Sequence, residues 1–195
     1  KYLLNSDTIT NDDLIIILRH DVDDKPENSL RMAKLEYSLG IAGSYYFRAV
    51  PCSWKVEIIK SIKKLGHEIG YHYETMDTAN GDIDKAWEQF QLHLKELREI
   101  SNVSTVCMHG SPKSKFDNKD IWNKYDYKNV NIIGEPYFDI DFNSVLYLTD
   151  TGRRWDGYNV SVRDRVDEQK EWIEKGILFH STNDIIKKIL NNNFP

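Results

Sequence analysis

Residues 14–24 read LIIILRHDVDD, a short apolar run that ends abruptly in charged side chains. The run at 14–18 is rich in β-branched residues, which is typical of a strand buried on both faces. Pro26 suits a first helical turn, apolar residues recur near helical spacing from Leu30 to Leu39, and Gly40 follows as a helix-terminating residue. This stretch therefore predicts a strand, an acidic loop and a helix.

The same order of elements recurs downstream. We expect further strands at 44–47, 68–72 and 105–108, a helix capped by Ser53 and closed by Gly66, and a long helix over 82–100. The second half is less regular, with strand candidates at 131–133, 145–148 and 177–179 and helices at 165–175 and 182–190. Strands that alternate with helices predict right-handed crossovers and a parallel α/β sheet, either open or closed as a barrel.

Length and composition limit the class of protein. A chain of 195 residues predicts one domain over residues 1–195. The net charge of -5, with scattered cations, argues against a nucleic-acid partner, and no apolar run is long enough for a transmembrane segment. A pI of about 5.7 and the lack of a signal pattern favour a cytoplasmic location. Cys52 and Cys107 lack the spacing of a thiolate zinc site, so we expect two buried thiols.

Polar side chains follow the predicted strands. Asp21 and Asp23 follow the first strand, Arg48 the second, His72 the third and His109 the fourth. Because the carboxyl ends of parallel strands meet at one edge, we expect the two aspartates and the two histidines to share a cleft. Two carboxylates with an imidazole favour zinc, cobalt, nickel or iron over magnesium or calcium. One carboxylate can then bind the metal while the other acts as a general base.

Several blocks of the sequence carry a family resemblance. Residues 19–24 (RHDVDD), 45–48 (YYFR) and 66–72 (GHEIGYH) occur in order, and 108–112 (MHGSP) and 148–155 (LTDTGRRW) follow. From about residue 14 to its end, the chain resembles the polysaccharide deacetylase superfamily (NodB homology, carbohydrate esterase family 4), especially its Asp-x-Asp branch of surface-polysaccharide biosynthesis. The resemblance implies a distorted (β/α)7, TIM-like barrel and a divalent metal, with zinc first. It also implies a hydrolase of carbohydrate metabolism that removes an N-acetyl group from a sugar or polysaccharide precursor by cleaving a non-peptide C–N bond.

The resemblance assigns roles to individual residues. Asp21 matches the family's general base, Asp23 its metal-binding carboxylate and His72 its first metal histidine. The second metal histidine normally lies four residues after the first, where this chain has Met76. Because a thioether is a poor ligand for a hard or borderline cation, another residue must complete the site, or the site is weak.

Glu74 and His109 are the nearest candidates for the missing ligand. His109 lies where the family usually places an arginine that orients the base, so it is either a metal ligand or a partner of the base. His67 precedes Glu68 in its strand, and alternation turns it away from the side of Glu68 and His72. His109 is therefore the preferred third ligand.

The general acid has two possible positions. The family supplies a histidine after its last barrel strand, and His180 follows the strand candidate at 177–179. Alternatively, residues 180–184 begin a helix with Ser181 or Thr182 as the N-cap. The acid-bearing strand would then lie beyond residue 195, and the barrel would lack its last strand here. Arg48 and Trp155 are expected to line the sugar cleft, with simple packing as their other reading.

Two other functions compete with a deacetylase. A carbohydrate-binding pseudoenzyme would keep the barrel without the full metal set, which Met76 favours. A phosphoryl-transfer enzyme would use Asp21 as a nucleophile and bind magnesium. The histidine at position 72 argues against the second alternative.

Overall fold

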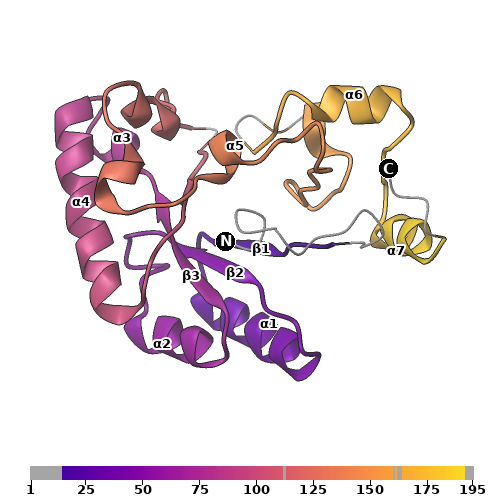
Figure 1. Cartoon of the computed structure of the whole chain (residues 1–195), viewed down its shortest axis with the longest axis horizontal. Coiled ribbons are helices and arrows are strands. Elements are labelled where there is room, and N and C mark those ends of the chain that lie inside the picture. Colours follow the sequence, from indigo (N-terminus) through magenta and orange to yellow (C-terminus); the bar gives the residue numbers. More distant parts are fainter. Residues whose placement is uncertain (1–14, 112, 160, 162–163, 192–195) are drawn as a thin grey trace. The chain divides into compact units, whose positions relative to one another are not determined.

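A parallel four-stranded sheet organises the first part of the protein (Figure 1). The structure, a computed structural model, describes residues 15–111, 113–159, 161 and 164–191. The strands β1 (Arg19–Val22), β2 (Ser44–Phe47), β3 (Glu68–Tyr73) and β4 (Val106–Met108) lie in chain order, and every neighbouring pair is parallel. The sheet curls like half of a barrel. Because helices separate its strands along the chain, the predicted mixed α/β class is confirmed. This arrangement is compatible with part of a (β/α) barrel.

The chain forms two compact units. Unit 1 comprises Lys1–His109 and Ser114–Asp139, and unit 2 comprises Gly110–Lys113 and Ile140–Pro195. All four strands belong to unit 1.

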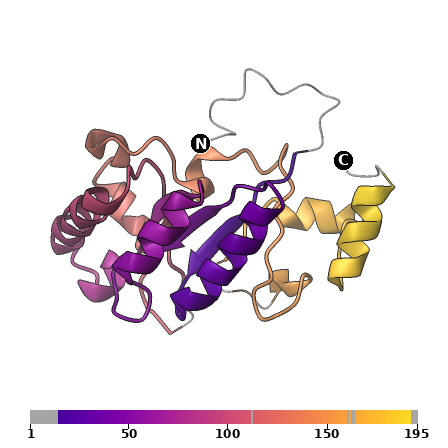
Figure 2. The same cartoon turned by 90° about the horizontal axis from the view of Figure 1, so that it is seen from below.

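Helices of unit 1 connect the strands and cover one face of the sheet. Figure 2 shows α1 (Pro26–Ser38) and α2 (Val56–Lys64), in indigo and purple, lying over the strands. The remaining helices of this unit are α3 (Thr75–Thr78), α4 (Ile83–Ile100), η2 (Asn118–Asn123), η3 (Tyr127–Val130) and α5 (Pro136–Asp139).

Ser53 does not cap α2, contrary to the sequence prediction. The helix begins after Lys55, which makes no side-chain cap. The Ser53 hydroxyl instead donates to the Val22 carbonyl at 2.5 Å and accepts from the Arg48 amide at 3.1 Å. Its side chain is used to join the ends of β1 and β2, so it is not available to the helix.

The first strand begins five residues later than predicted. The strand expected at 14–18 is wrong: residue 14 lies outside the described residues, residues 15–18 form no strand, and Ile16 and Ile17 are 59% and 44% exposed. The partner strand explains the shift. The Ser44 amide bonds to the Leu18 carbonyl at 2.9 Å, and the chain before Ser44 turns through Gly40 at φ 73°, so within the described part of the chain residues 15–17 have no strand beside them.

Strand alternation gives the sheet two chemically different faces. The helix-covered face supplies core residues Val22, Tyr45, Phe47, Ile69, Tyr71, Tyr73, Val106 and Met108. The opposite face, called the polar face below, presents Arg19, Asp21, Ser44, Tyr46, Glu68, Gly70, His72, Thr105 and Cys107. Branched apolar residues usually fill this side of a barrel. Here Glu68 accepts hydrogen bonds from the Ser44 hydroxyl at 2.7 Å and the Thr105 hydroxyl at 2.9 Å.

Gly70 is required because the Tyr46 ring lies across it on the polar face. A Cβ at position 70 would lie 2.3 Å from two ring atoms of Tyr46. We expect Gly70→Ala to lower the free energy of unfolding by about 1–3 kcal/mol, the usual cost of overpacking, as measured by urea denaturation. The same change in a Tyr46→Ala background should cost little, because the ring is gone; equal costs in both backgrounds would contradict the steric explanation.

Unit 2 is built from short helices and irregular chain. It contains η4 (Gly157–Asn159), α6 (Gln169–Glu174) and α7 (Thr182–Leu190), the last of which matches its prediction. Residues 145–148 and 177–179 form no strand, nor do 131–133 in unit 1, so these three strand predictions are wrong. In unit 2 the Gln169 side-chain amide donates to the Tyr147 carbonyl at 3.3 Å, so a side chain takes a backbone acceptor of the strand predicted at 145–148. Among the described residues, no helix is long and apolar enough to cross a membrane.

Candidate metal centre

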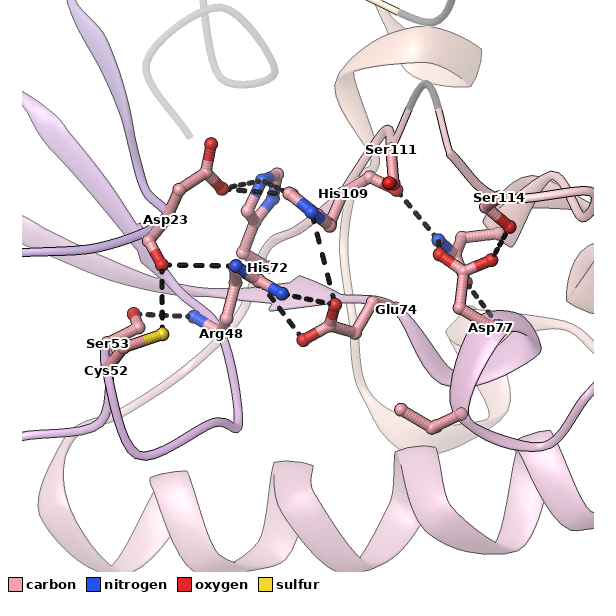
Figure 3. A network of polar contacts seen from close by, with 12 residues as sticks. Asp23, Arg48, Cys52, Ser53, His72, Glu74, Asp77, His109, Ser111 and Ser114 are labelled. Atoms are coloured by element: carbon pink, nitrogen blue, oxygen red, sulfur yellow. Dashed lines mark hydrogen bonds and ion pairs between the residues drawn. The ribbon is translucent and has the colours of Figure 1, made fainter.

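The carboxyl ends of three strands bring a carboxylate and two imidazoles together. Asp23 follows β1, His72 lies near the end of β3, and His109 follows β4 (Figure 3). Asp23 Oδ1 lies 2.9 Å from His109 Nδ1 and 3.4 Å from His72 Nε2, and the two nitrogens are 3.2 Å apart. Side chains from separate parts of the sequence thus direct three ligand atoms at one point.

The geometry of these three atoms fits a divalent metal ion. Zinc bound tetrahedrally at its usual bond lengths holds its ligand atoms about 3.4 Å from one another. The three separations seen here, from 2.9 to 3.4 Å, are close to that spacing without any movement of the chain. One carboxylate with two imidazoles is also a ligand set that suits zinc, iron, cobalt or nickel.

His72 is oriented for this role by its second nitrogen. Its ring is buried, and Nδ1 donates to the Cys107 carbonyl of the neighbouring strand at 2.9 Å. This bond leaves Nε2 as the nitrogen with a lone pair directed at the site, which is the usual arrangement of a metal-binding histidine. The register that pairs His72 with Cys107 therefore fixes the ring.

The charges of the site favour an ionised carboxylate. Burial on its own would raise the pKa of Asp23, but hydrogen bonds to His109 and His72, and the charge of both rings, hold it below its ordinary value. Burial lowers the pKa of His72, but the charge of Asp21 and the hydrogen bond to Asp23 outweigh it and raise this pKa. The two imidazoles therefore favour the ionised form of Asp23, which is the form that binds a metal ion.

Asp21 lies beside the three ligands, and one of its two carboxylate oxygens has no hydrogen-bond partner in the structure. Its Oδ2 is 3.0 Å from the Arg19 guanidinium. Its Oδ1 is buried and has no hydrogen-bond partner in the structure. Because buried polar atoms are normally satisfied, this oxygen suggests that a water, substrate or ion belongs next to it.

Glu74 supports the site from outside the ligand cluster. Both of its oxygens bond to Arg48, at 3.1 Å from Nε and 2.6 Å from Nη2, and Oε2 is 4.0 Å from His109 Nε2. Arg48 also donates to the Asp23 carbonyl at 3.1 Å, so it ties together the ends of three strands. With Glu74 engaged in this way, His109 is the better third ligand, and a role of Arg48 in sugar binding stays a prediction.

Met76 and His67 both lie away from the centre. Met76 is buried in the hydrophobic core. His67 accepts a hydrogen bond from the Gly43 amide at 3.0 Å and bonds to the Ala33 carbonyl at 2.8 Å. These bonds confirm that alternation turns His67 away from the side of His72. Met76, in the core, supplies no ligand to the centre.

Trp155 and His180 belong to unit 2. His180 Nδ1 lies 2.9 Å from Asp156 Oδ2, and the Trp155 indole donates to the Thr182 hydroxyl at 3.0 Å. Ser181 caps α7 in a reciprocal capping box with Asp184, which confirms the helix start as one reading of this segment. The catalytic role of His180 and the sugar-binding role of Trp155 stay predictions.

Sequence reasoning missed three polar residues near the site. Arg19 lies two positions before Asp21 in the same strand, so alternation alone could have placed both side chains on one face. Cys107 is buried as predicted, and the strand register places its thiol beside His72 on the polar face. Cys52 is exposed, so its predicted burial is wrong. Glu135 is fully buried and accepts a hydrogen bond from the Met108 amide at 3.0 Å; no local pattern marks it.

Comparison of the chain with protein-family models, with curated proteins and with solved structures found no significant match.

Proposed function

We propose that the protein is a metal-dependent carbohydrate N-deacetylase of the NodB type, built on a partial (β/α) barrel. The observation that carries the proposal is the convergence of Asp23, His72 and His109, with the unpartnered Oδ1 of Asp21 beside them. A metal-ligand cluster next to an available carboxylate is the arrangement that metal-assisted hydrolysis requires.

Asp23, His72 and His109 would hold the metal ion. When bound there, a divalent ion lowers the pKa of a water molecule and polarises a carbonyl oxygen. The carbonyl of Cys107 holds the His72 ring in place, and Arg48 holds the backbone of Asp23. The protein thus supplies both the ligands and the contacts that keep them in position.

Asp21 would act as the general base. Its Oδ1 is available to take a proton from the attacking water, while Arg19 holds Oδ2 and fixes the orientation of the carboxylate. The water oxygen bonds to the acetyl carbon, the C–N bond breaks, and acetate and a free sugar amine form. The amine requires a proton, a role that the resemblance gives to a histidine, for which His180 is the candidate in the sequence. Trp155 and Arg48 are the proposed sugar contacts.

Release of acetate from acetylated glycans tests this function. The full chain loaded with zinc or cobalt should release acetate from oligomers of N-acetylglucosamine, and chelation should stop the reaction. Glycan binding without acetate release would instead establish the carbohydrate-binding alternative. Magnesium-dependent hydrolysis of p-nitrophenyl phosphate, with no acetate release, would establish the phosphoryl-transfer alternative.

A further inference from the structure

A second set of potential metal ligands lies on the polar face, directly beside the first. One ligand atom from each of Asp21, His72 and Cys107 lies within 4.8 Å of the others. The register of β3 and β4 pairs His72 with Cys107, so alternation places the imidazole and the thiol side by side. Cys107 is fully buried, and it is not in a disulfide.

This inner set, defined as Asp21, His72 and Cys107, has a different chemistry from the outer set of Asp23, His72 and His109. A thiolate is a soft ligand that selects zinc or cadmium over magnesium, calcium or manganese. The buried, unpartnered Oδ1 of Asp21 is an independent sign that something belongs at this point. Binding would release the thiol proton to solvent and leave a thiolate on the ion.

The two sets compete for one imidazole. His72 Nδ1 bonds to the Cys107 carbonyl at 2.9 Å, which leaves Nε2 as the ligand atom for either set. We propose that the inner set binds a thiophilic divalent ion, zinc or cadmium, in a mode that excludes an ion from the outer set. Resting on the proposed function, this mode also occupies the general base Asp21, so it inhibits hydrolysis.

Cadmium titration of the full chain tests this inference. Thiolate bound to cadmium gives a near-ultraviolet charge-transfer absorption that carboxylate and imidazole ligands do not give. We expect this band to saturate at one cadmium per chain and to persist in Asp23→Asn, which weakens only the outer set. Cys107→Ser should lose the band. The matched control Cys52→Ser should keep it, because Cys52 is the exposed cysteine and belongs to neither set.

The outcomes separate this inference from the proposed function. Cadmium bound by the wild type without the band, or a band that survives in Cys107→Ser, would overturn the inner set. If circular dichroism shows that Cys107→Ser does not fold, Asp21→Asn takes its place as the test variant. Loss of the band is then the expected result in Asp21→Asn. Cobalt bound by Cys107→Ser with acetate release would leave the proposed function intact even if the inner set fails. Acetate release failing in every metal form would overturn the proposed function, while the cadmium band would still report on the inner set.

Discussion

Asp23→Ala will remove the divalent ion from the outer set, whereas Asp21→Asn will keep it there and lower turnover about 10²- to 10⁴-fold. Asp23 provides the oxygen that lies against both imidazoles, at 2.9 Å from His109 and 3.4 Å from His72. Without it, the outer set has no anionic ligand and loses one of three coordinating atoms. In a Cys107→Ser background, which removes the thiolate of the inner set, metal analysis after dialysis should therefore find about one zinc per chain, and none once Asp23→Ala is added.

Asp21→Asn separates the loss of proton transfer from the loss of metal binding. Its side-chain oxygen can still accept a hydrogen bond from Arg19, so the local geometry is kept, but the amide cannot take a proton from water. Zinc content should stay near that of the wild type while kcat for acetate release falls. Asp24→Asn is the matched control, because Asp24 is exposed and belongs to neither ligand cluster. Equal metal loss in the variants of Asp21 and Asp23 would mean that the two carboxylates do not divide the work in this way.

Alternation and strand order were enough to anticipate the centre of the site. Short apolar runs followed by Asp21, His72 and His109 predicted that these residues lie at one sheet edge, and the three contribute to overlapping ligand clusters. The prediction worked because parallel neighbouring strands all end on the same side, whatever the helices between them do. The helix-covered core followed from the same periodicity.

The failures have a common physical cause. A short apolar run forms a strand only where a partner lies beside it, and among the described residues 15–17 have none. Likewise, the Ser53 hydroxyl bonds to the Val22 carbonyl at the end of β1, so it does not cap α2. Polar residues such as Glu135 are buried by tertiary contacts that no local pattern contains. Local patterns predict structure least well in the irregular second half, where side chains such as Trp172 bond to backbone groups.

Glu135 should make the stability of the protein depend on pH. Its side chain is fully buried, and burial raises its pKa from 4.5 to about 7, although the amides of Met108 and Tyr137 and the Tyr73 hydroxyl donate to it. In the unfolded chain the carboxyl ionises near pH 4.5, while in the folded protein it keeps its proton up to about pH 7. Folding therefore binds a proton in this window, and stability falls as the pH rises through it.

The shift corresponds to about 3 kcal/mol between pH 4.5 and 7, with little further change above pH 7. Glu135→Gln removes the ionisation, so urea denaturation should show the wild type losing about 3 kcal/mol relative to this variant across the window. The test is how the stability difference changes with pH, and not the absolute stability of Glu135→Gln. The side-chain amide of this variant next to the Tyr137 backbone amide lowers the free energy of unfolding by the same amount at every pH. Glu88→Gln, at an exposed position of α4, should track the wild type throughout. A difference between wild type and Glu135→Gln that does not vary with pH would mean that the carboxylate is ionised in the folded core, and that its three donors compensate fully for its burial.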